Sequence, residues 1–232
     1  MEWLRNEETR KEQNVSFVFS LASGAIRLFH GKMTTVWEMP YDGEHCVFCP
    51  NHSGAMGPIA MCVYFEGREK CHPWYSADAA NRKKLPGYVR QDYWWKPGCK
   101  LEPLYNVTVP YLAALLMPPL FKGISGIPVY YDIQVVKTYR ESLAWLKKGE
   151  NIVIFPEHST GYDTHADQLS RGFLRVAPLA WKQLGIKLKF YPVHTDGRTI
   201  WVKAPVCYDP EIPLEEQEEK LLTAIMDGLS HP

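Results

Sequence analysis

The sequence predicts one α/β domain in which helices flank a mixed, mostly parallel sheet, with an amphipathic helix at the N-terminus. Segments with the pattern of strands alternate with longer segments whose apolar residues recur every three or four positions. The chain has 232 residues, enough for one large domain, and neither a repeat nor a low-complexity linker divides it. We therefore expect a helix within residues 1–32 and a single domain over residues 33–232.

The N-terminal helix is predicted over residues 14–29. Its apolar residues have the spacing of one helix face: Val15, Val18, Phe19, Ala22, Ala25, Ile26 and Phe29. An amphipathic helix of this kind either covers the core of the domain or rests on a bilayer surface.

The elements of the domain follow in chain order. A strand is predicted over 32–39, a turn over 40–43, a strand over 46–49 and a helix over 53–65. Further strands are expected at 129–131, 152–155, 187–191 and 199–203, and helices at 135–147, 173–183 and 213–229. This alternation favours a sheet that is at least partly parallel.

Residues 78–122 are less regular. The first part, 78–103, mixes basic with aromatic residues and is predicted to be an insert, which either meets lipid headgroups or is a solvated surface feature. The apolar run 111–121 is too short to span a bilayer, and we expect a helix that ends at Pro118 and Pro119. This helix is buried, lines an acyl-chain tunnel, or dips into a membrane.

Composition excludes several classes of protein. Lys and Arg number 26, as do Asp and Glu, so no net positive field favours nucleic acid as a partner. No apolar run has the length of a membrane span, and the charged first residues do not form a cleavable signal. The expected location is the cytoplasm, free or peripherally bound to the inner face of a membrane. The six cysteines are then expected to be reduced thiols.

Cys46 and Cys49 form a CxxC pair flanked by His45 and His52, which raises the alternative of a zinc site. The surrounding sequence has the pattern of a buried strand. Because strand side chains alternate between faces, residues three apart point in opposite directions and cannot easily share one metal. Core cysteines are therefore the favoured interpretation.

Four segments carry chemistry-bearing residues in a distinctive order. They are Phe48–Ile59, which contains Asn51-His52, then Gly126–Tyr131, Ile152–Gly161 and Phe190–His194. Their order and spacing resemble the glycerolipid acyltransferase superfamily, which includes the 1-acyl-glycerol-3-phosphate acyltransferases. The patterns of that family are Asn-His-x4-Asp, Gly-x-Ile-Pro-Val-x-Arg, Phe-Pro-Glu-Gly-Thr-Arg and a late Pro-Val. The resemblance covers about residues 33–229.

The resemblance implies an acyltransferase of lipid metabolism. It would move an acyl group from acyl-CoA or acyl carrier protein, the co-substrate, to a hydroxyl or amine, with no cofactor and no metal. His52, between a strand and a helix, would be the general base that takes the proton of the acceptor. Glu157 is the second catalytic candidate. The expected substrate-side residues are Asn51, Ser53, Gly57, Tyr131, Pro156, His158, Ser159, Thr160, Gly161 and Arg171.

The sequence departs from the family pattern at three positions. The acid five residues after the histidine is Gly57, which cannot orient an imidazole, and Glu157 is one candidate to replace it. Tyr131 and Thr160 stand where the family has arginines that would grip a phosphate. We therefore expect an acceptor less anionic than a glycerol phosphate, although Arg171 could supply charge from the following loop.

Two alternatives remain open at this point. Gly57 also fits a catalytically lapsed member of the family that works as a lipid-binding or interaction module. A distant third hypothesis is a metal-dependent hydrolase built on His158, Asp163 and His165. For His52 itself, the alternative to catalysis is a histidine that caps the turn between strand and helix by hydrogen bonds.

Overall fold

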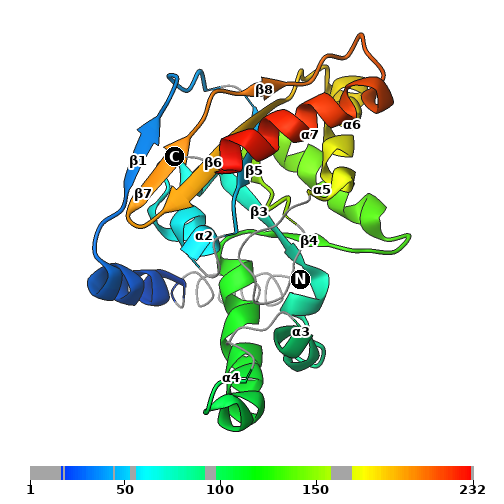
Figure 1. Ribbon diagram of the computed structural model, residues 1–232. Helices are drawn as coiled ribbons and strands as arrows, with labels where there is room; N and C mark the ends of the chain where they lie inside the picture. The colour runs from blue at the N-terminus through cyan, green and yellow to red at the C-terminus, as the bar shows by residue number, and fades with distance from the viewer. Residues whose placement is uncertain are drawn as a thin grey trace, which may run out of the picture.

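A single mixed β-sheet organises the chain (Figure 1). The computed structural model describes residues 17, 19–43, 45–52, 56–91, 98–157 and 169–230, and within them eight strands lie in the order β1-β7-β6-β2-β5-β3-β4, with β8 paired to β6. The strands are β1 (Thr34–Trp37), β2 (Cys46–Pro50), β3 (Cys71–Ser76), β4 (Ile127–Val129), β5 (Asn151–Val153), β6 (Lys189–Asp196), β7 (Thr199–Val202) and β8 (Val206–Cys207).

The central strands of the sheet are parallel. β2 pairs in parallel with both β5 and β6, and β3 pairs in parallel with β5 and β4. Only the β6–β7 and β6–β8 pairs among the described strands are antiparallel. The predicted fold class, a single α/β domain with a mixed, mostly parallel sheet flanked by helices, is confirmed.

Helices cover both faces of this sheet. They are α2 (Met56–Ile59), η1 (Ala60–Tyr64), η2 (Arg68–Lys70), η3 (Ala77–Ala80), α3 (Leu85–Gln91), α4 (Glu102–Gly123), α5 (Val135–Lys147), η4 (Arg171–Arg175), α6 (Val176–Leu184) and α7 (Leu214–Ser230). A further helix, residues 19–30, precedes β1, whereas residues 1–16 of the chain, which include the start of the predicted 14–29 helix, lie outside the described part.

Alternate side chains of β2 point to opposite faces of the sheet and pack in two separate hydrophobic cores. Val47 and Cys49 pack with α5, α6 and α7 on one face of the sheet. Cys46 and Phe48 pack on the other face with residues of η1 and with β1 and β7. Cys46 and Cys49 therefore point to opposite faces of the sheet, as the strand pattern predicts.

Most predicted elements are found near their expected places, but strands β3 and β8 were missed. Helix α5 has the predicted bounds, and α6 and α7 differ from the prediction by a few residues. The predicted helix over 53–65 is described from Met56, and its second half, η1, is a π-helix. Strand β3 was not predicted, because Pro73 interrupts its apolar pattern.

The connection from β3 to β4 is helical and projects from the sheet (Figure 1). The predicted insert, 78–103, forms its first part, and α4 completes it. A small core of its own joins Leu85 and Val89 of α3 to Ala113 of α4. This connection is therefore a helical pair with a separate hydrophobic cluster.

Helix α4 differs from its prediction. It continues through Pro110, Pro118 and Pro119 to Gly123, so the expected end at the prolines is wrong. Residues 102–121 are long and apolar enough to cross a membrane by length and composition, which corrects the expectation that no segment reaches that length. The outer side chains of α4 are exposed, so the alternative of a fully buried helix is also wrong.

Candidate functional site

The candidate site lies where β2 and β5 end side by side. Val47 and Phe48 of β2 pair with residues of β5, so both chains leave the sheet at the same carboxyl edge. His52 follows β2 and Glu157 follows β5. The backbone N–H of His52 donates a hydrogen bond of 2.6 Å to Oε2 of Glu157. The first and third sequence segments therefore meet at this edge of the sheet.

The His52 side chain is exposed at this edge. The ring of Phe155 meets it edge-on, with 5.4 Å between the ring centroids. No hydrogen bond to the His52 imidazole comes from the residues that the structure describes. The ring is thus placed by its contact with Phe155 and by the backbone, and its exposure leaves it accessible to a substrate.

Asn51 fixes the backbone just before His52. Its side-chain Oδ1 accepts hydrogen bonds of 2.8 Å from both the backbone N–H and the hydroxyl of Thr195, and its Nδ2 donates to the Thr195 carbonyl at 3.3 Å. Its own backbone N–H donates to the carbonyl of Val193. The fourth sequence segment, in β6, is therefore hydrogen-bonded to the first through Asn51. These bonds fix the position of the backbone immediately before His52.

Thr195 is a residue of the site that sequence reasoning missed. It stands two residues after Val193 of the late Pro-Val pattern, and nothing in a single threonine distinguishes it from others in strands. Only the parallel pairing of β2 with β6 brings it to Asn51.

Gly57 packs against the backbone of the same turn. A Cβ atom at this position would lie 2.3 Å from the carbonyl oxygen of His52 and 2.4 Å from that of Asn51. The Gly57 N–H instead donates a 3.1 Å hydrogen bond to the His52 carbonyl. Position 57 therefore has no room for any side chain in this conformation. Glycine here is required by packing, and a carboxylate cannot occupy the place that the family pattern gives it.

The described residues on either side of 158–168 contact each other. Pro156 accepts a 2.7 Å hydrogen bond from the N–H of Ser170, and Glu157 forms an antiparallel bridge with Leu169. The predicted substrate-side residues His158, Ser159, Thr160 and Gly161 lie between these points, outside the described residues, as do Ser53 and the Asp163 and His165 of the metal hypothesis.

Two predicted residues are not brought to His52. Tyr131 follows β4, which is separated from β2 by β5 and β3, and its side chain is 87% exposed. Arg171 forms ion pairs with Glu218 and Glu219 of α7. Its positive charge is therefore already matched by two carboxylates.

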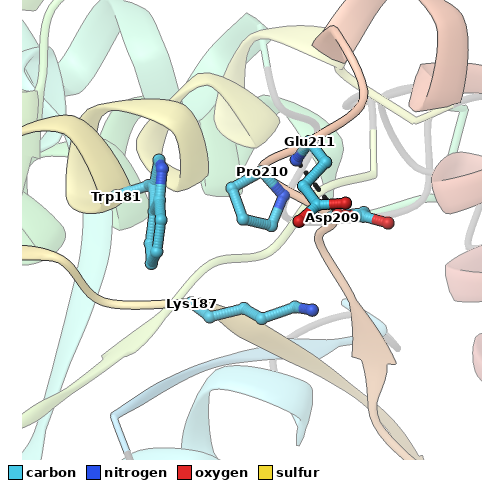
Figure 2. A pocket seen from close by; sticks show the side chains of 5 residues that line it. All are labelled: Trp181, Lys187, Asp209, Pro210 and Glu211. Atoms are coloured by element: carbon cyan, nitrogen blue, oxygen red, sulfur yellow. Dashed lines mark hydrogen bonds between the residues drawn. The ribbon is translucent and has the colours of Figure 1, made fainter.

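Two surface hollows of the described part of the chain lie away from these residues. Figure 2 shows one of about 340 Å³, in which Trp181 and Lys187 face Pro210 and its acidic neighbours Asp209 and Glu211. The other, about 400 Å³, is largely aromatic and is lined by Trp37, Pro40, Tyr41, Phe48, Phe65, Glu66, Gly67, Cys71 and Asn151. Neither contains a candidate site residue, so we place the site by its chemistry at the sheet edge.

No group of three or more His, Cys, Asp or Glu side chains is close enough to hold a metal ion within the described ranges. Burial raises the pKa of Cys46 and Cys49, because each thiol is desolvated in the core. Thiols held in the neutral form are poor metal ligands.

No protein-family model and no curated protein matches the sequence. Among solved structures, the chain is similar to the 1-acyl-sn-glycerophosphate (LPA) acyltransferase PlsC from Thermotoga maritima, with 14% sequence identity and a TM-score of 0.45. The match covers 97% of this chain and 82% of that chain.

Proposed function

We propose that the protein is an acyltransferase that moves an acyl group from a thioester, acyl-CoA or acyl carrier protein, to a hydroxyl or amine. The observation that carries the proposal is the 2.6 Å hydrogen bond that joins His52 to Glu157 at the carboxyl edge of β2 and β5. These residues come from the first and third of the four segments that resemble the glycerolipid acyltransferases. The fourth segment supports them through Asn51 and Thr195.

In the proposed reaction, His52 is the general base. Its imidazole takes the proton of the acceptor while the acceptor oxygen or nitrogen forms a bond to the thioester carbonyl carbon. The carbon–sulfur bond then breaks, and the imidazolium returns the proton to the leaving thiolate. Glu157 is a positioning residue in this scheme, because its carboxylate holds the backbone amide of His52 and not the ring.

Two observations favour an acceptor without a phosphate group. Arg171 is paired with Glu218 and Glu219, and Tyr131 stands where a phosphate-binding arginine would be expected. An alcohol, an amine or a sugar-like head is therefore the proposed acceptor class. A cytoplasmic location, with contact to the inner face of a membrane, belongs to the same proposal, since the product would be a lipid.

The test is thiol release from acyl-CoA and acyl carrier protein of several chain lengths, with acceptors that do or do not carry phosphate. We expect thiol release that depends on the acceptor, and an acylated neutral acceptor in the mass spectrum. A preference for glycerol 3-phosphate or a lysophosphatidate would overturn the acceptor class. No turnover with any pair of substrates would overturn the enzyme itself.

A second candidate function is favoured by Gly57. Because the backbone fills the position of the family acid, the chain also fits a lapsed acyltransferase that binds a lipid without turning it over. This candidate predicts that a fluorescent fatty acyl probe binds the protein while every thioester stays intact. Turnover that disappears in His52→Ala would remove it.

A further inference from the structure

Helix α4 is apolar on all sides, but the domain covers only one of them. Residues 103–121 contain no charged side chain. The inner side packs on the domain: Phe121 stacks on Tyr75 with ring centroids 4.5 Å apart, and Ala113 is buried against α3. A helix that is apolar all round is stable when both sides are covered.

The outer side of α4 forms a continuous exposed stripe. Its large side chains are between 47% and 63% exposed and recur at helical spacing: Leu104, Val107, Tyr111, Leu112, Leu115 and Leu116. Six such residues on one surface helix are more than isolated exposed apolar groups and mark an interaction site.

A second exposed apolar face lies on the helix of residues 19–30 and the described residue before it. Phe17, Leu21, Leu28 and Phe29 are 66% to 88% exposed. The inner side of this helix is fixed to η1, because Arg27 donates a 2.6 Å hydrogen bond to the Val63 carbonyl and Tyr64 donates one to the Ile26 carbonyl. Figure 1 shows this helix and α4 in the lower part of the molecule.

The charge distribution also distinguishes this side of the molecule. The segment 78–103, which leads into α4, has six basic and three acidic residues, and Arg82, Lys83 and Lys100 are exposed. The segment 209–219, which leads into and begins α7, has six acidic residues and no basic one. α7 lies along the upper side in Figure 1. The chain has no net charge, yet one end suits an anionic surface and the other is repelled by it.

We infer that the outer faces of α4 and of the helix 19–30 together form a membrane-docking surface that inserts into an anionic lipid bilayer. A bilayer fits α4 better than a protein partner for two reasons. Its stripe offers no charged group to fix a register, and α4 contains three internal prolines, which are more frequent in membrane helices than in soluble ones. Docking would place the carboxyl edge of the sheet, with His52, towards the lipid. The binding itself does not require His52 to be active.

The experiment is flotation of the purified full chain with vesicles of phosphatidylcholine, alone or with about one third phosphatidylglycerol. We expect binding to the anionic vesicles that weakens as salt is added. The double variant Leu112→Glu/Leu115→Glu should lower the partition coefficient at least about tenfold, since two exposed leucines no longer enter the bilayer.

The matched control is Trp181→Glu/Ile212→Glu. It adds the same charge to exposed apolar residues, 45% and 40% exposed, at the end of the molecule that carries α7. It should bind vesicles as the wild type does, and thermal unfolding should show that both double variants are folded. Equal losses in the two variants would overturn the inference.

Analytical ultracentrifugation without lipid tests whether a second copy of the chain, and not a bilayer, covers the stripe on α4. A wild-type dimer that Leu112→Glu/Leu115→Glu converts to a monomer, together with no vesicle binding, would assign the stripe to a second copy of the chain and overturn the inference. A His52→Ala chain should bind vesicles like the wild type, so a failure of vesicle binding and a failure of acyl transfer are separate results.

Discussion

The carbonyl oxygen of His52 lies so close to Gly57 that a Cβ atom on residue 57 would be 2.3 Å from it. The Gly57 N–H closes the same turn by a hydrogen bond to that oxygen. The departure from the family pattern is therefore part of the fold of the turn. A carboxylate could be placed at residue 57 only if the backbone around His52 took another course.

Restoring the family acid should consequently fail. Gly57→Asp and Gly57→Ala should each lower the free energy of unfolding by about 2 kcal/mol or more, because the new Cβ overlaps two carbonyl oxygens. Urea denaturation measures this. Gly87→Ala on α3, where a Cβ meets nothing within 4 Å, is the control and should not destabilise. Increased thioester turnover in a folded Gly57→Asp chain would contradict this reading of the turn.

The position of His52 should depend on a hydrogen-bond acceptor in the side chain of residue 157. Glu157→Ala removes the acceptor of the His52 N–H, and we expect kcat to fall about tenfold to a hundredfold as the ring moves from its place. Glu157→Gln keeps an acceptor and should retain most of the activity. Glu216→Ala, exposed on α7, is the matched control. If Glu157→Gln were as inactive as Glu157→Ala, the charge and not the hydrogen bond would be needed.

Arg90 should compensate for a proline in α4. Pro110 has no N–H for the carbonyl of Asn106, and Arg90 Nη2 donates to that carbonyl at 3.1 Å. Arg90→Ala should therefore cost about 1 kcal/mol of stability in the wild type. In a Pro110→Ala background the helix supplies its own donor, so the same change should cost less. A double-mutant cycle with no coupling between the two positions would contradict this role.

The buried thiols should be inert until the chain unfolds. Desolvation raises the pKa of Cys62 and of Cys71 to about 12, whereas Cys207 is exposed. At neutral pH we expect iodoacetamide to label Cys207 in the folded protein and Cys71 only in urea. A Cys207→Ser chain should lose the early labelling. Rapid labelling of Cys71 in the native state would contradict this prediction and show that the amino end of β3 opens to solvent.

The same thiols predict how stability changes with pH. Because their pKa values are higher in the folded chain than the ordinary value of 9.0, ionisation of the unfolded chain favours unfolding as pH rises above about 9. Each thiol that ionises only on unfolding should lower the free energy of unfolding by about 1.4 kcal/mol per pH unit. Cys62→Ala and Cys71→Ala should each reduce this slope in urea titrations at alkaline pH.

Elements with a clear apolar period could be predicted from the sequence. Helix α5 alternates buried and exposed residues at helical spacing, and its bounds were predicted without error. Strand β3 could not be found in this way, because it contains His72 and Pro73. His72 is buried only because the fold satisfies both of its ring nitrogens, at the Ser125 carbonyl and the Glu150 carboxylate, and stacks the ring on Trp145.

The closeness of two site residues could be predicted from the sequence, because the carboxyl ends of neighbouring parallel strands lie at the same edge of a sheet. That rule brings His52 and Glu157 to one edge. It does not show that the Glu157 carboxylate meets the backbone of His52 and not the ring, or that Gly57 is enclosed by carbonyl oxygens. Helix α4 was predicted too short because proline usually ends a helix in water, and the contact from Arg90 that compensates for Pro110 depends on tertiary structure.

The most direct test of the proposed acyl transfer is the rate of thiol release in His52→Ala compared with His45→Ala. Both changes remove an imidazole next to β2, one at its carboxyl end and one at its amino end. We predict that His52→Ala lowers kcat by a factor of about 10² to 10⁴, while His45→Ala keeps the wild-type rate. Equal rates in wild type and His52→Ala, with both chains folded, would contradict the assignment of His52 as the general base.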